Sequence, residues 1–317
     1  MYTSFSILPD LPTLTSSLKS ALSGCGVADG AVEIVERQFN DYAAGSPSEI
    51  VTCRLADGQE LRLLLKYQAE GDGWSNTTYE AEVYRRLLDP MQAGTPTFYG
   101  AHQEENGRTW LVLEYLDDCL SLLEMADEHS ASVSAAWLGR FHAASEAQLA
   151  NSSLSFLKVY DADYYREAAD RTLQLAAGSL HLFPWLTALV HRFGKLVIEL
   201  CASEPTIIHG DFHPSNLLFP SEVVYPIDWE MAGISAGEMD LACLIDGWAE
   251  IEPRCALEYK NARWPEGAPV DFERRLKIAQ LALYFYKLSS RPNWMSDQDS
   301  IGDYEGLLAI GEQLGVI

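Results

Sequence analysis

The sequence predicts an α+β fold, with a small sheet in the first third of the chain and a mostly helical remainder. Three short apolar runs read as neighbouring strands, at residues 33–39, 49–55 and 61–67. Later in the chain, apolar positions recur at helical spacing over residues 131–150, 162–176 and 184–202. The chain has 317 residues and is 48% hydrophobic, which is enough for two lobes around a cleft.

Two further elements complete the first third of the chain. Residues 1–24 are expected to form a helix or arm that packs on the small lobe. Residues 76–88 place apolar side chains at helical spacing, behind Asn76 or Thr77 as the capping residue. We therefore expect one main helix beside the sheet.

Residues 207–230 carry three polar side chains in a spacing that suits phosphoryl transfer. Asp211 follows an apolar pair and a glycine turn, and its carboxylate can orient an acceptor hydroxyl or take its proton. Asn216 and Asp228 offer hard oxygen ligands, of which Mg²⁺ takes one or two beside phosphates and water. Phosphoryl transfer depends mainly on placement and on charge neutralisation. The pattern predicts a kinase, and the second acid and the strands around it argue against a chance match.

The runs HGDFHPSN and IDWE resemble the catalytic segment of the aminoglycoside phosphotransferase and choline kinase superfamily, relatives of protein kinases. The resemblance implies a protein-kinase-like bilobal fold. Its N-lobe would be a small antiparallel sheet with one main helix, and its C-lobe would be larger and mostly helical. It also implies that Asp211 is the catalytic residue, that Asn216 and Asp228 bind magnesium, and that His209 supports the loop from beneath.

The same resemblance requires a lysine for the phosphates and a helix glutamate that holds it. Lys66 lies in the apolar run LRLLLKY and is the only lysine between positions 20 and 190 apart from Lys158. The alternative for Lys66 is an exposed lysine that protects a sheet edge. Glu80 and Glu82 are both candidates for its partner, and residues two apart do not share a helix face. Glu80 fits the family pattern better.

Further contacts to the nucleotide are expected in two places. The segment 42–48 either curves backbone N–H groups towards phosphates or forms an ordinary hairpin turn. Residues 109–116 resemble the last strand of the small lobe and the linker that binds adenine, with the Glu114 carbonyl and the Leu116 amide as contacts. The resemblance thus implies ATP and Mg²⁺ as cofactors, and the use of GTP instead of ATP stays open.

We place the lobe boundary between a nucleotide-binding lobe, 1–116, and a helical lobe with the catalytic loop and acceptor site, 117–317. The chain contains no HRD, DFG or APE, and the segment from Asp228 to Asp240 is too short for an activation segment. A protein kinase switched by phosphorylation is therefore not expected. By resemblance Asp240 supports the catalytic loop, and the alternative is an ordinary acid near a helix N-terminus.

The charge of the chain limits its partners. A formal net charge of −24 argues against nucleic-acid binding, which needs a positive surface. Between residues 228 and 260 there are eight acids and two basic residues. Acids of this stretch that follow the catalytic segment closely are Glu230, Asp246, Glu250 and Glu252. They either attract a cationic acceptor or lie on solvated helix faces of an acidic protein.

The six cysteines show no CxxC spacing and no accompanying histidine cluster, so neither a zinc site nor a disulfide framework is indicated. The first residues lack the basic region and apolar core of a signal peptide, and no apolar run is long enough for a bilayer. We therefore expect a cytoplasmic protein with no membrane partner.

The predicted function is an ATP- and Mg²⁺-dependent phosphotransferase that moves the γ-phosphate to a hydroxyl of a small molecule. An aminoglycoside-like antibiotic, an amino alcohol or another metabolite would serve as acceptor, and the motif does not distinguish among them. The alternative is a nucleotide-binding pseudoenzyme or scaffold with the same fold. Every expected catalytic residue is present, which argues against this alternative.

Overall fold

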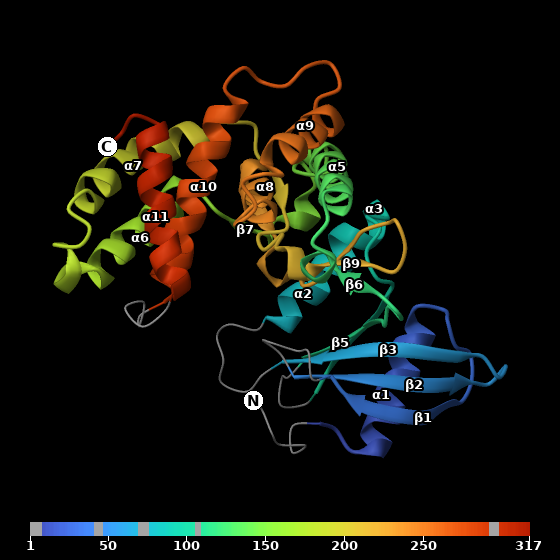
Figure 1. The fold of residues 1–317 in the computed structure, drawn as a ribbon. Coiled ribbons are helices and arrows are strands. Elements are labelled where there is room, and N and C mark those ends of the chain that lie inside the picture. The colour runs from blue at the N-terminus through green and yellow to red at the C-terminus, as the bar shows by residue number, and fades with distance from the viewer. Residues whose placement is uncertain (1–7, 41–46, 69–75, 105–108, 292–297) are drawn as a thin grey trace. The chain divides into compact units, whose positions relative to one another are not determined.

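In the computed structural model, the chain folds into two compact units (Figure 1). The first unit comprises Met1–Leu120 and Leu218–Met231, and the second comprises Ser121–Leu217 and Ala232–Ile317. The residues that the structure describes are 8–40, 47–68, 76–104, 109–291 and 298–317. A strand-rich first unit and a helix-rich second unit confirm the predicted α+β class.

A five-stranded antiparallel sheet forms the centre of the first unit. In spatial order its strands are β1 (Val32–Phe39), β2 (Ser48–Leu55), β3 (Glu60–Tyr67), β5 (Thr109–Glu114) and β4 (Phe98–Gln103). The strands predicted at 33–39, 49–55 and 61–67 are confirmed. Side chains alternate between the two faces of a strand, so Leu65 and Tyr67 face one side and Lys66 faces the other. Both Leu65 and Tyr67 are fully buried.

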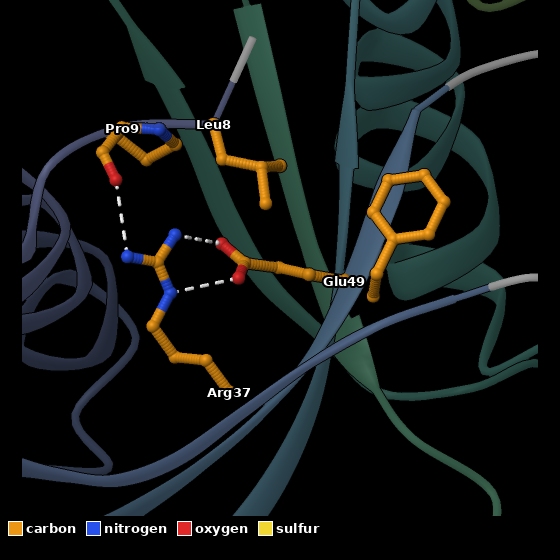
Figure 2. A pocket seen from close by; sticks show the side chains of 5 residues that line it. Leu8, Pro9, Arg37 and Glu49 are labelled. Carbon is orange, nitrogen blue, oxygen red and sulfur yellow. Dashed lines mark hydrogen bonds and ion pairs between the residues drawn. The ribbon is translucent and has the colours of Figure 1, made fainter. Parts of the chain in front are cut away.

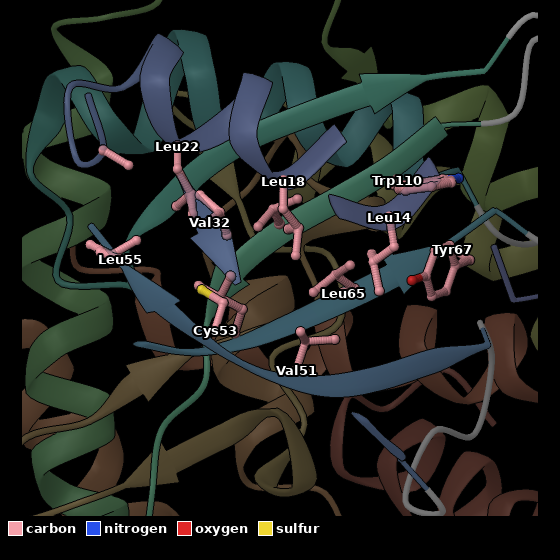
Figure 3. Packing of buried hydrophobic residues seen from close by; sticks show 13 residues of the cluster. Leu14, Leu18, Leu22, Val32, Val51, Cys53, Leu55, Leu65, Tyr67 and Trp110 are labelled. Carbon is pink, nitrogen blue, oxygen red and sulfur yellow. The ribbon is translucent and has the colours of Figure 1, made fainter. Parts of the chain in front are cut away.

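The helix α1 (Leu11–Gly24) covers the face of the sheet opposite to Lys66. Its residues Leu14, Leu18 and Leu22 are fully buried and pack with strand residues such as Trp110 (Figure 3). Their spacing of four residues places them on one side of the helix. Burial of each leucine stabilises the fold by roughly 1.5–3 kcal/mol. The helix expected within residues 1–24 therefore packs on the sheet of its unit.

A partly buried ion pair anchors the chain just before α1. Figure 2 shows Arg37 of β1 donating to both carboxylate oxygens of Glu49, at 2.8 and 2.9 Å, and to the Pro9 carbonyl, at 3.1 Å. Leu8 and Phe39 complete the lining of a small pocket at this place. Because the carboxylate of Glu49 is 1% exposed, its pairing with Arg37 removes the penalty of an uncompensated buried charge.

The helix after β3 begins as predicted but is less regular. It consists of α2 (Thr77–Val83), a π-helical turn (Tyr84–Leu88) and α3 (Asp89–Met91). The side chain of Asn76 accepts the N–H of Tyr79 at 3.0 Å and caps α2. The sequence predicted a regular helix over 76–88, whereas the structure widens the turn from Tyr84. The wider turn accompanies burial of four neighbouring side chains, those of Val83, Tyr84, Leu87 and Leu88.

The first unit also contains a short segment from later in the chain. This segment includes the last two residues of β9 (Leu217–Phe219) and all of β10 (Tyr225–Pro226), and the two strands are neighbours in a small sheet. The 3-10 turn Trp229–Met231 follows and contacts α2. The sequence analysis assigned all of 117–317 to the C-terminal lobe, and the contacts of residues 218–231 are with the first unit.

Packed helices make up most of the second unit, which the chain enters within β6 (Leu120–Ser121), followed by α4 (Leu122–Met125). The helix α5 (Glu128–Glu146) packs along α9 (Glu252–Arg263). The helix α10 (Phe272–Ser289) packs against α6 (Ala162–Leu175), α7 (Leu186–Cys201), α8 (Glu238–Leu244) and α11 (Gln298–Gln313). The helices predicted at 131–150, 162–176 and 184–202 are confirmed. The first of them begins earlier, because Asp127 caps it by accepting the N–H of Ser130.

One strand of a three-stranded sheet directly precedes the predicted catalytic loop. In it, β11 (Gly233–Ser235) lies between β7 (Lys158–Val159) and β8 (Thr206–Ile208). All three residues of β8 are buried, so the strand fixes the start of the loop that begins at His209.

The six cysteines are free thiols. In the part of the chain that the structure describes, no helix combines the length and the apolar character needed to cross a membrane.

Candidate active site

The predicted site residues divide between the two units. The first unit holds Lys66, Glu80, Glu114, Leu116 and Asp228, and the second holds Asp211 and Asn216. Of the segment 42–48, predicted to cover phosphates, the residues up to 46 lie outside the described part of the chain. Each unit therefore carries a polar cluster of its own.

Lys66, near the end of β3, is surrounded by three carboxylates. Its Nζ lies 2.8 Å from Glu80 Oε2, 2.6 Å from Asp228 Oδ1 and 3.6 Å from Glu230 Oε2. The helix α2 supplies Glu80, and the segment after β10 supplies Asp228 and Glu230. We call these four residues the lysine cluster. The lysine side chain is 14% exposed, so it is not the exposed edge lysine that was the alternative.

Of the two glutamates weighed as partners of Lys66, the structure brings Glu80 to it. Glu80 is 1% exposed, whereas the side chain of Glu82 is 24% exposed and forms ion pairs with Arg85 and Arg86. The second carboxylate oxygen of Glu80 accepts the backbone N–H of Trp229 at 3.1 Å. Glu80 thus ties α2 both to the lysine and to the backbone that follows Asp228.

One ammonium among three carboxylates leaves an excess of negative charge in the lysine cluster. Burial by itself lowers the pKa of Lys66, but the nearby carboxylates outweigh burial and hold this pKa above its usual value. Burial raises the pKa of Glu80 and of Glu230, and the attraction of Lys66 opposes that rise. A second cation would reduce the repulsion among the acids.

The carboxylates of the lysine cluster fit a magnesium ion. One oxygen from each of Glu80, Asp228 and Glu230 lies within 4.8 Å of the others. Asp228 is the most accessible of the three, with 38% of its side chain exposed. Carboxylate oxygens are the ligands that Mg²⁺ prefers. The sequence analysis noted Glu230 only as one of several acids, and its spacing of two residues from Asp228 was the signal for a shared site.

The backbone at Asp228 has an unusual conformation. Its φ is 66°, in the left-handed region, which costs a residue other than glycine about 1–3 kcal/mol. The next residue holds this conformation, because Trp229 is fully buried and its ring N–H donates to the Pro226 carbonyl at 3.1 Å. The turn directs the carboxylate of Asp228 to Lys66.

Glu114 and Leu116 lie at the end of β5 and in the linker that follows it. The Glu114 carboxylate accepts the hydroxyl proton of Thr97 at 2.7 Å, so its side chain is engaged within the first unit. Arg62 holds the linker, since its carbonyl accepts the N–H of Tyr115 at 3.1 Å and its guanidinium lies 4.7 Å from the centre of the Tyr115 ring. The adenine contacts through the Glu114 carbonyl and the Leu116 amide stay predictions.

In the second unit, Asp211 and Asn216 are brought together. The amide Nδ2 of Asn216 donates to both the backbone carbonyl and the carboxylate of Asp211, each at 3.0 Å. Gly210 has a φ of 83°, which favours glycine at the turn just before Asp211. His209 is fully buried, and its Nδ1 accepts the N–H of Asp211 at 3.2 Å. The loop is thus closed by hydrogen bonds around Asp211.

Asp240, from α8, holds the backbone that precedes Asp211. Its Oδ2 accepts the N–H of His209 at 2.6 Å, and its Oδ1 accepts the N–H of Gly210 at 2.9 Å. Asp240 is 1% exposed, and His142 Nε2 from α5 lies 3.2 Å from its Oδ2. Asp240 therefore supports the loop from a buried position. His142 lies within the helix predicted at 131–150, and the sequence analysis assigned it no role.

Two of the acids that follow the catalytic segment are paired with lysines of α10. Lys287 donates to Asp246 at 2.8 Å, and Lys277 donates to Glu252 at 2.8 Å. Both lysines lie outside the stretch 228–260 in which the sequence analysis counted charges. The negative charge that these acids offer to a cation is therefore smaller than their number indicates.

Comparison with known proteins adds the family. Residues 84–272, more than half of the chain, match the model of the phosphotransferase enzyme family. This range includes the predicted catalytic loop and begins after Glu80. A search of curated proteins finds no match.

Several solved structures share the fold over nearly the whole chain. A choline kinase from Cryptosporidium parvum is 13% identical, with a TM-score of 0.63 over 97% of this chain and 98% of its own. An aminoglycoside phosphotransferase from Alicyclobacillus acidocaldarius is 16% identical, with a TM-score of 0.61 over 99% and 96%. The GDP complex of wild-type aminoglycoside 2'-phosphotransferase-IIIa is 15% identical, with a TM-score of 0.64 over 97% and 99%. The chain therefore belongs to the phosphotransferase enzyme family and has the protein-kinase-like fold of these solved structures.

Proposed function

We propose that the protein is an ATP- and Mg²⁺-dependent phosphotransferase that moves the γ-phosphate to a hydroxyl of a small molecule. The lysine cluster carries the proposal, because a partly buried Lys66 lies 2.8 Å from Glu80 and 2.6 Å from Asp228. In kinases, a strand lysine held by a helix glutamate contacts the phosphates, and an aspartate holds the metal. Membership of the phosphotransferase family supplies the class of reaction.

In this proposal Lys66 places its positive charge on the phosphates, and Glu80 keeps it there. Asp228 and Asn216 are the magnesium ligands. The amide nitrogen of Asn216 donates to Asp211, so its carbonyl oxygen is the atom with the chemistry to ligate a metal. Bound magnesium neutralises the charge of the β- and γ-phosphate oxygens. The Glu114 carbonyl and the Leu116 amide bind adenine.

Asp211 is the proposed catalytic residue. Its carboxylate orients the acceptor hydroxyl and takes its proton while the oxygen forms a bond to the γ-phosphorus. The bond from that phosphorus to the β–γ bridging oxygen breaks, and ADP leaves. Asn216 holds the carboxylate of Asp211 at 3.0 Å, and the buried ring of His209 holds its backbone, so the group has little freedom before substrate binds.

The proposed acceptor is a small hydroxylated molecule such as an aminoglycoside-like antibiotic or an amino alcohol. Kinases with both kinds of acceptor in their names share the fold, but at 13–16% identity they do not select between the two. Asp246 and Glu252 are each paired with a lysine, so we do not base the acceptor class on their charge.

An ADP-release assay with Mg-ATP, or a GDP-release assay with Mg-GTP, run against aminoglycosides, amino alcohols, sugars and macrolides, tests the proposal. We expect acceptor-dependent ADP that falls by on the order of 10²–10⁴ in Asp211→Asn. The matched control is Asp170→Asn, which changes an exposed aspartate of α6 in the same unit. Unchanged turnover in Asp211→Asn would contradict the role of Asp211. Nucleotide binding without any acceptor-dependent ADP would favour the pseudoenzyme instead.

A further inference from the structure

A buried series of hydrogen bonds continues from Asp240 into helix α9. His142 Nδ1 lies 2.9 Å from the hydroxyl of Tyr259. That hydroxyl accepts an N–H of Arg263 at 2.6 Å, and Arg263 donates twice to Glu146, at 3.0 and 2.7 Å. His142 and Tyr259 are fully buried, and Arg263 is 5% exposed. We call Asp240, His142, Tyr259 and Arg263 the α9 relay.

The donors of the α9 relay all point the same way. A carboxylate only accepts, so the proton between His142 and Asp240 belongs to His142 Nε2. An arginine only donates, so the oxygen of Tyr259 accepts from Arg263 and its own O–H is directed to His142 Nδ1. Burial lowers the pKa of His142, against the opposing attraction of Asp240, and this keeps the ring neutral. The neutral ring supplies one donor and one acceptor, as the two bonds require.

Backbone packing fixes the position of the α9 relay. A Cβ at Gly237, just before α8, would overlap Arg263 and would lie 2.5 Å from the Tyr259 hydroxyl and 2.6 Å from His142 Nδ1. A Cβ at Gly139 of α5 would lie 2.6 Å from the Tyr259 carbonyl oxygen. Only glycine fits at either position. The three helices therefore approach closely enough that the relay has little room to rearrange.

We propose that Tyr259 and Arg263 are positioning residues for the catalytic loop, acting through His142 and Asp240. The inference rests on the proposed function, in which Asp211 orients the acceptor hydroxyl. Asp240 accepts the N–H groups of the two residues directly before Asp211, so the orientation of its carboxylate sets the loop backbone. His142 fixes that orientation, and Tyr259 fixes the ring of His142. A helix outside the catalytic motif thus controls the placement of the reacting carboxylate.

Hydrogen exchange at the Gly210 and His209 amides measures this control without any need for an acceptor. In Tyr259→Phe we expect these amides to exchange about tenfold faster, as loss of one buried hydrogen bond implies. The matched control is Tyr165→Phe, which removes a buried hydroxyl in the same unit that bonds Ser235 at 2.9 Å. In the control we expect no change at these amides. Equal exchange in Tyr259→Phe and Tyr165→Phe would overturn the proposal.

Two substitutions of His142 separate the two ends of its ring. In His142→Gln the amide nitrogen reaches the position of Nε2 and can donate to Asp240. In His142→Asn the amide oxygen replaces Nδ1 and accepts from Tyr259, while the bond to Asp240 is lost. We expect kcat about tenfold lower in His142→Asn than in His142→Gln, with the same KM for nucleotide in both. Equal kcat values, or the reverse order, would contradict the relay.

Failure of the relay and failure of the proposed function give different results. If Asp211→Asn keeps full turnover, the proposed function fails, while the exchange of the Gly210 amide still reports on the relay. If Asp211→Asn abolishes turnover and Tyr259→Phe matches Tyr165→Phe in both exchange and kcat, only the relay fails. The relay itself predicts that Tyr259→Phe lowers kcat about tenfold and leaves the KM for nucleotide unchanged.

Discussion

The lysine cluster of the first unit and the α9 relay of the second hold their functional groups by opposite means. In the cluster, one lysine faces three carboxylates, and Asp228 is partly exposed on a left-handed backbone. In the relay, a neutral His142 and the carboxylate of Asp240 bind only donors and acceptors of matching kind, and both side chains are buried. The cluster carries excess negative charge, whereas in the relay each hydrogen-bond donor meets an acceptor.

This difference corresponds to different tasks. A site that takes up a metal and phosphates gains from carboxylates that still lack sufficient positive charge. A loop that places a hydroxyl gains from a backbone whose position is set before substrate arrives, because reorganisation then adds nothing to the barrier. We therefore expect substitutions in the cluster to respond to magnesium and substitutions in the relay not to respond to it.

The largest effect is expected for Lys66→Met, which leaves three carboxylates without their shared cation. Removing one partner of a buried ion pair costs about 3–5 kcal/mol, so the free energy of unfolding should fall by about this amount. Millimolar Mg²⁺ should restore part of it, which urea unfolding with and without the metal measures. The control is Lys19→Met, at an exposed lysine of α1. A loss of stability that magnesium leaves unchanged would break the comparison.

Asp228→Asn should weaken magnesium-dependent binding of nucleotide by roughly 100-fold, since it removes the most accessible carboxylate of the cluster. Nucleotide affinity without magnesium should change far less, because that binding does not use the metal ligand. Fluorescence titration with and without Mg²⁺ measures both affinities. If the two affinities fell by the same factor, Asp228 would not be a metal ligand.

Glu80→Gln separates activity from stability within the lysine cluster. The substitution removes one of three acids around a lysine, so we expect the free energy of unfolding to change by less than about 1 kcal/mol. The lysine loses its helix partner, so kcat/KM for nucleotide should fall about tenfold. Glu82→Gln on the same helix is the control and should alter neither quantity. Equal kcat/KM in the two variants would remove Glu80 from its proposed role.

The smallest expected effect is a pH dependence of stability that belongs to His142. Burial lowers its pKa in the folded chain, and the unfolded chain keeps a value near ~6.5. The unfolded state then binds the proton more readily, so the free energy of unfolding decreases as the pH falls below ~6.5 and is unaffected above it. The charged and titratable groups that act on this ring are Asp240, Glu238, Tyr259 and Arg263.

Urea midpoints at pH 7 and pH 5 for the wild-type chain and for His142→Gln measure this contribution. Other titrating groups are common to both proteins and cancel in the difference. The variant should lose less stability between the two pH values than the wild type does. An identical loss in the two proteins would show that His142 is not held neutral.

Much of the fold follows from local patterns in the sequence. The strands around 49–55 and 61–67 and the helices around 162–176 and 184–202 repeat their apolar residues with the period of the element they form. The π-helical turn at Tyr84–Leu88 does not follow from such a pattern. The apolar residues of this stretch recur at spacings of four, as in Val83 and Leu87, and this spacing fits both a regular helical turn and a wider one. Periodicity alone therefore does not reveal the π-helical turn.

The site shows where such reasoning ends. The spacing within 207–230 predicted that Asp211 and Asn216 belong to one phosphoryl-transfer site. This prediction was possible because the two residues are only five positions apart and contact each other locally. The roles of His142 and Asp246 depend instead on partners far away in the sequence, Tyr259 for the first and Lys287 for the second. No composition or spacing within one segment predicts a pair that only tertiary packing brings together.

Calorimetric titration of Mg-ATP into the wild-type chain and Asp211→Asn, combined with turnover on an active acceptor, tests the central claim most directly. The account assigns nucleotide and metal binding to the lysine cluster together with Asn216, and the chemical step to Asp211. It predicts that Asp211→Asn binds Mg-ATP within about twofold of the wild type and loses on the order of 10²–10⁴ in kcat. Full turnover in Asp211→Asn, or loss of Mg-ATP binding together with turnover, would contradict it.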